Sequence, residues 1–127
     1  MSPRPRLVVA RFSAIAERRA LQVRVRGLDL VLIREGDDVS VLYGRCPHRG
    51  AAMGDARVEG PDLICAAHGW DFCFLTGVSP SSPEDRLHKF ESAVDLASDE
   101  VLVSEEEIDR FFADHPQAFD ADEHLGV

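Results

Sequence analysis

The order of apolar and polar residues in the first half of the chain predicts β-strands. Over residues 21–26 (LQVRVR) the two kinds alternate, which is typical of a strand with one buried face. Residues 28–33 (LDLVLI) are more continuously apolar and predict a second, more buried strand after a break at Gly27. A hairpin turn is predicted at 35–38, with a returning strand over 39–43.

Short strand signals continue to residue 103. A turn at 58–62 sits inside a predicted hairpin, and the segment Ser79–Pro83 (SPSSP) is expected to be a loop because proline cannot donate to a sheet ladder. The remaining short strands are expected around residues 63–64, 71–75, 89–91, 94–96 and 101–103. No helix is predicted before residue 104, so we expect a mainly β fold.

The pattern changes at Ser104. Ser104 and Glu107 have the spacing of a capping box, and an apolar stripe follows at helical spacing. The stripe consists of Ile108, Phe111 and Phe112. The helix is expected to end near His115 because Pro116 follows. We therefore predict a β domain over residues 1–104, and a C-terminal helix with an acidic tail over 105–127 that serves as a linker or docking segment.

Composition bounds the class of protein. The 127 residues suit one soluble domain, and the net charge of −9 argues against a nucleic-acid partner and for docking on basic protein surfaces. No apolar run approaches the ~20 residues that cross a bilayer, so no membrane association is expected. An odd total of three cysteines favours a reducing compartment, and we expect a cytoplasmic location.

Four residues have the spacing of metal ligands. Cys46 and His48 form one C-x-H pair, and Cys65 and His68 form a C-x-x-H pair. Sixteen residues separate His48 from Cys65, which is enough for one β-hairpin to carry both pairs. Zinc also binds two Cys and two His, but usually with both Cys first. The alternating order suits a two-iron cluster, with the cysteines on one iron and the histidines on the other.

The two loops, CPHRGA and CAAHGWDF, together with the later Thr76-Gly77, resemble those of Rieske-type ferredoxin domains. The resemblance covers roughly residues 5–104. It implies stacked antiparallel β-sheets, with a Rieske-type [2Fe-2S] cluster at the tip of a two-loop cluster-binding subdomain. The four ligands would be Cys46, His48, Cys65 and His68. Ser79–Pro83 would be the family's proline-containing third loop.

Departures from the respiratory-complex Rieske proteins narrow the subtype. Neither ligand loop carries the additional cysteine that forms a disulfide in those proteins, since Ala66 and Ala67 lie between the second pair. Trp70 and Phe72 stand where those proteins place hydroxyl residues that bond the cluster and raise its potential. We therefore expect a low potential, near ~−150 mV, like that of oxygenase-linked ferredoxins.

The resemblance implies an electron carrier without substrate chemistry of its own. Its expected partners are a flavin-dependent reductase and an acceptor oxidoreductase. One alternative is a Rieske domain of a larger or multi-component oxidoreductase, either an oxygenase or a glutamate-synthase-like FMN protein. A structural zinc module is a third possibility. Cys73 is expected to have a packing role, and His88, His115 and His124 are expected to have packing or surface roles.

Overall fold

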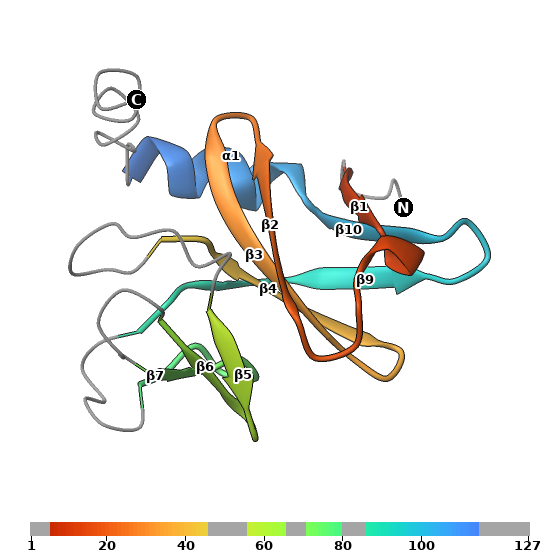
Figure 1. Cartoon of the computed structure of the whole chain (residues 1–127). Coiled ribbons are helices and arrows are strands. Elements are labelled where there is room, and N and C mark those ends of the chain that lie inside the picture. Colours follow the sequence, from red (N-terminus) through yellow and green to blue (C-terminus); the bar gives the residue numbers. More distant parts are fainter. Residues whose placement is uncertain (1–5, 46–55, 66–70, 80–85, 115–127) are drawn as a thin grey trace, which may run out of the picture.

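The computed structural model describes residues 6–45, 56–65, 71–79 and 86–114, which form ten strands and one α-helix (Figure 1). The strands are β1 (Arg6–Arg11), β2 (Ala20–Val25), β3 (Leu28–Glu35), β4 (Asp38–Tyr43), β5 (Arg57–Glu59), β6 (Asp62–Ile64), β7 (Asp71–Cys73), β8 (Lys89–Phe90), β9 (Ser92–Asp95) and β10 (Glu100–Ser104). A short 3-10 helix spans Phe12–Ala14, and α1 spans Glu105–Asp114.

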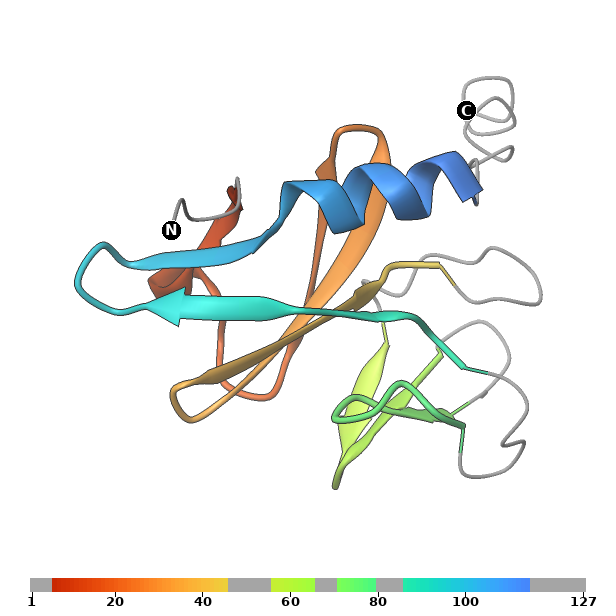
Figure 2. The same cartoon turned by 180° about the vertical axis from the view of Figure 1, so that it is seen from behind.

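The strands form three antiparallel sheets. The first has the order β1-β10-β9, the central one β2-β3-β4-β8, and the small one β5-β6-β7. The first sheet and α1 lie on one side of the central sheet, and the small sheet lies beside the end of β4 (Figures 1 and 2). The predicted fold class, mainly β with stacked antiparallel sheets and a C-terminal helix, is confirmed.

Strand β3 is buried on both faces, and its alternation divides the core in two. Leu28, Leu30 and Leu32 join the core shared with the first sheet and α1. Val31 and Ile33 point the other way and join the core of the small sheet. A strand between two apolar layers reads as a continuous apolar run, which is why residues 28–33 carry so few polar positions.

Most predicted strands are found, with their turns. The break at Gly27 is confirmed: Arg26 and Gly27 both have positive φ angles, 52° and 83°, and join β2 to β3. Two positive φ angles in succession match the right-handed twist of a hairpin. Strand β1 was not predicted from the sequence, and its short apolar stretch pairs with β10 at the far end of the domain.

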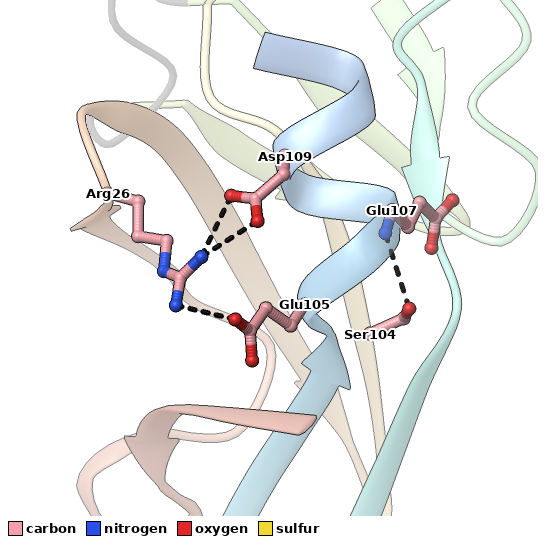
Figure 3. A network of polar contacts seen from close by, with 5 residues as sticks. All are labelled: Arg26, Ser104, Glu105, Glu107 and Asp109. Carbon is pink, nitrogen blue, oxygen red and sulfur yellow. Dashed lines mark hydrogen bonds and ion pairs between the residues drawn. The ribbon is translucent and has the colours of Figure 1, made fainter. Parts of the chain in front are cut away.

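Helix α1 begins as the sequence predicts. The backbone N–H of Glu107 donates to Ser104 Oγ at 3.3 Å (Figure 3). Ile108 and Phe111 are buried in the same core as β3. The carboxylate of Glu107 reaches across to the central sheet region. There it accepts the N–H of Glu91 and lies 3.0 Å from His88 Nε2.

The β2–β3 turn holds the other side of the helix. Arg26 Nη1 donates to Asp109 Oδ2 at 2.8 Å, and Nη2 donates to Glu105 Oε1 at 2.7 Å (Figure 3). These hydrogen bonds, that of Asp109 first, raise the pKa of Arg26 above its ordinary value. Helix α1 is therefore bonded to the β domain on two sides, through Glu107 on one and through Arg26 on the other. The domain boundary after residue 104 stays a prediction. Within the described residues, no helix is long and apolar enough to cross a membrane.

Candidate metal centre

Cys65 is the predicted ligand that the structure describes. It directly follows β6, is 1% exposed, and is a free thiol packed in the core of the small sheet. A buried cysteine without a disulfide partner is a soft donor shielded from water, which fits an iron–sulfur ligand. The other three predicted ligands, Cys46, His48 and His68, lie outside the described residues.

The small sheet fixes where the second ligand pair enters and leaves the fold. Ile64 pairs with Asp71 at the ends of β6 and β7, so residues 65–70 join two directly paired strands. Strand β5 pairs with β6 in turn, with Arg57 opposite Ile64. The hairpin predicted between the two ligand pairs is therefore present, and the second pair belongs to the loop of the next hairpin.

Two aromatic side chains are buried in the same core as Cys65. Phe72 and Phe74 are both almost completely buried in the core that contains Cys65. Phe72 is thus a core residue, while Trp70 lies outside the described residues. Cys73 is half-buried, and its carbonyl accepts the N–H groups of Thr76 and Gly77. These bonds form a turn at Thr76-Gly77.

The segment after that turn is anchored to the same hairpin. Ser79 is fully buried, and its hydroxyl lies 3.3 Å from Asp71 Oδ1. Asp71 is the first residue of β7, directly after the 66–70 segment. Of the predicted third loop, Ser79 is described and residues 80–83 lie outside the described part. The start of that loop is therefore hydrogen-bonded to Asp71, which belongs to the second ligand motif, CAAHGWDF.

A buried ion pair lies directly before the first ligand segment, the motif CPHRGA that begins at Cys46. Arg45 Nε donates to Asp29 Oδ2 at 2.6 Å, and Arg24 Nε donates to Asp29 Oδ1 at 2.8 Å. Asp29 and Arg45 are the buried charged residues in the part of the chain that the structure describes. Neither residue was predicted from the sequence to be part of the site. The sequence feature that could have revealed them is Asp29, a carboxylate within the apolar run LDLVLI.

The remaining titratable residues do not form a second metal site in the described ranges. There, no three His, Cys, Asp or Glu side chains gather as possible metal ligands. The ring of His88 packs against Phe90 and Phe111, with centroids 4.5 Å and 4.9 Å away, so its predicted packing role is confirmed. His115 and His124 lie outside the described residues.

Comparisons with known proteins agree with this architecture. The family model of the Rieske [2Fe-2S] domain matches residues 6–91. The solved ferredoxin of carbazole 1,9a-dioxygenase from Nocardioides aromaticivorans IC177 superposes with a TM-score of 0.69 at 21% identity. That match covers 78% of this chain and 96% of the ferredoxin. At this identity, the superposition shows a shared fold.

Two curated relatives are more similar in sequence over shorter stretches. The phenoxybenzoate dioxygenase subunit alpha of Ectopseudomonas oleovorans is 37% identical over 81 residues, which are 61% of this chain and 20% of the relative. The 4beta-methylsterol monooxygenase of Methylococcus capsulatus is 38% identical over 56 residues, which are 43% of this chain and 15% of the relative. The chain therefore spans a fifth or less of the length of these two relatives.

Proposed function

The chain belongs to the Rieske [2Fe-2S] domain family, and on that premise we propose that it carries single electrons from a flavin-dependent reductase to an acceptor oxidoreductase. The family's cofactor is a Rieske-type [2Fe-2S] cluster, and a Rieske domain serves electron transfer. When bound, the cluster supplies one-electron redox chemistry, whereas the protein's part is to hold it, tune it and dock. The zinc alternative has no support from the family match.

We assign the cluster to four ligands, with Cys46 and Cys65 on one iron and His48 and His68 on the other. The observation that carries this assignment is the buried free thiol of Cys65 at the end of β6. Its loop closes on the paired residues Ile64 and Asp71, so the backbone around this ligand is held by the sheet. Cys46 follows Arg45, which is itself buried and ion-paired.

An oxygenase is the acceptor that the relatives favour. The superposed ferredoxin serves a dioxygenase, and both curated relatives are oxygenases. The net charge of −9 supports docking on a basic surface of such a partner. The reductase remains a proposal by chemical class, since a one-electron carrier needs a donor that delivers electrons singly, as flavins do.

The second candidate is a Rieske domain that works inside a larger oxidoreductase. The observation that favours it is the 37–38% identity to oxygenases of which this chain matches only a fifth or less. In that case, residues 105–127 lead toward a catalytic or FMN domain. The cytoplasmic location also stays a prediction.

Metal analysis and spectroscopy on one sample test the proposed function. Two irons and two acid-labile sulfides per chain are expected. A rhombic EPR signal after dithionite reduction is also expected, with an average g below that of an all-Cys cluster. A colourless protein with zinc in place of iron refutes the proposal. Reduction by a flavin reductase, followed by reoxidation with a purified oxygenase component, then tests the direction of electron flow.

A further inference from the structure

A carboxylate in the central strand of the fold holds two arginines, one of which precedes a proposed cluster ligand. Asp29 is 2% exposed and accepts hydrogen bonds from Arg24 at 2.8 Å and from Arg45 at 2.6 Å. The Arg45 side chain is 7% exposed and that of Arg24 is 44% exposed. Because water is largely excluded at Asp29 and Arg45, their charges are weakly screened and act over longer distances than surface charges.

This ion-paired group lies on the face of the central sheet that carries the small sheet. Asp29 alternates with Leu28 and Leu30, so it shares a face of β3 with Val31 and Ile33. Those two residues pack in one core with Cys65. Arg24 stands directly opposite Asp29 on β2. The group is therefore placed toward the cluster-binding side of the domain.

The backbone next to Arg45 is fixed to Asp29 as well. Gly44 N–H donates to the carbonyl of Asp29 at 2.8 Å. A Cβ at Gly44 would lie 2.9 Å from backbone atoms of Asp29 and Leu30, so the two chains approach more closely than a side chain allows. Two consecutive residues are thus held by Asp29, one through its carbonyl and one through its carboxylate, immediately before Cys46.

We propose that Asp29 and Arg45 are positioning residues that hold the first ligand segment and set the reduction potential of the cluster. This inference rests on the proposed function, in which Cys46 is a ligand. One electron added to any bound centre adds one negative charge. The guanidinium of Arg45 therefore favours the reduced form, and the carboxylate of Asp29 disfavours it.

The expected size follows from Coulomb's law. Arg45 and Cys46 are neighbours, whose Cα atoms lie about 3.8 Å apart across a trans peptide. A unit charge on the order of 10 Å from a redox centre changes its one-electron equilibrium by about tenfold at an effective dielectric constant of about 20. For a one-electron couple, a tenfold change is about 59 mV.

The test is redox titration of the purified holoprotein, followed by EPR and circular dichroism, in four variants. Arg45→Gln is expected to lower the reduction potential of the cluster, with a change of up to about tenfold in its one-electron equilibrium constant. Asp29→Asn is expected to raise the potential, because a buried negative charge is then lost. Arg45→Lys keeps the charge and is expected to stay near the wild type. Arg18→Gln is the matched control.

Arg18 is a suitable control because its charge is lost at an exposed pair, and its other contact, the carbonyl of Gly60, lies at the β5–β6 turn, at the opposite end of that hairpin from Cys65. Its partner Glu35 lies six residues along β3 from Asp29, which is about 20 Å. The potential of Arg18→Gln is expected to match that of the wild type. A shift as large as that of Arg45→Gln would mean that total charge, and not the buried pair, sets the potential.

Opposite signs for Arg45→Gln and Asp29→Asn separate tuning from mere structural support. A loop that is simply loosened responds alike to loss of either partner, so shifts of the same sign, or no shift, overturn the inference. If either variant fails to fold, Arg24→Gln takes its place, since Arg24 is half-exposed. A smaller lowering by Arg24→Gln supports the inference, and an unchanged potential overturns it. A wild type without two irons and a Rieske signal refutes the proposed function instead.

Discussion

Replacing Phe111 by alanine tests whether α1 is part of the folded core. Phe111 is 9% exposed and packs in the core shared with β3 and β10. Its ring centroid lies 5.0 Å from that of Tyr43, 4.9 Å from that of His88 and 5.2 Å from that of Phe90. Tyr43 ends β4, three residues before the proposed ligand Cys46. The helix therefore contacts the strand that leads into the first ligand segment.

The size of the effect follows from burial. Phe→Ala in a protein core costs about 3–5 kcal/mol, and Phe111 lies at the margin of its core, so we expect about 3 kcal/mol. For a chain of this length, that lowers the unfolding midpoint by roughly 10–15 °C. Phe112 is the matched control, since its ring is 37% exposed and lies over Gly27. Phe112→Ala is expected to cost about 1–2 kcal/mol, because about a third of the residue is already in water.

Thermal scans of both variants at one scan rate measure the difference, because loss of a cluster makes unfolding irreversible and the midpoint rate-dependent. Far-UV circular dichroism follows the fold, and visible absorbance of the same sample follows the cluster. Equal midpoints for Phe111→Ala and Phe112→Ala would refute the reasoning. They would mean that α1 adds no more to stability through its buried ring than through its exposed one.

Deleting residues 105–127 is expected to lower the midpoint at least as much as Phe111→Ala, while the folded fraction keeps its cluster spectrum; loss of that spectrum would contradict a boundary after residue 104. His68→Cys is expected to retain a cluster at a lower potential, because a thiolate replaces a neutral imidazole, and an unchanged potential would show that His68 is not a ligand. Gly44→Ala is expected to cost about 1–3 kcal/mol in thermal scans, because its Cβ would lie 2.9 Å from backbone atoms of β3; a wild-type midpoint would contradict that crowding. Hydrogen bonds from the Ser13 hydroxyl and N–H lower the pKa of Asp99 below its ordinary 3.8. The stability that this carboxylate contributes is present above about pH 3.8 and is lost as the pH falls toward the lowered pKa. Ser13→Ala is therefore expected to weaken the pH dependence of the free energy of unfolding on the acid side. An unaltered pH dependence would contradict the role of Ser13.

Local patterns in the sequence were sufficient for the hairpins and for the helix start. The alternation of residues 21–26 and the break at Gly27 involve neighbours along the chain, so short-range geometry decides them. The same holds for Ser104, whose hydroxyl caps a backbone N–H three residues later. The ligand motif is likewise local, since each Cys stands within three residues of its His. The family follows from these motifs, and its match over residues 6–91 confirms it.

Only the tertiary structure showed which distant segments meet. Strand β1 is too short to be recognised by itself, and its partner β10 lies more than eighty residues away. The alternation of side chains in β3 shows that the strand has two buried faces, but it does not show which elements cover each face. The two cores on either side of β3 could therefore not be predicted.

The ion pair of Asp29 and Arg45 shows the same limit most clearly. The sequence places a carboxylate in an apolar run and an arginine sixteen residues later, and nothing local links them. The register of β3 and β4 brings the two together, since Gly44 lies opposite Asp29 and Arg45 follows. A buried charge is tolerated only where its counter-charge is held in place, and that placement is a property of the folded sheet.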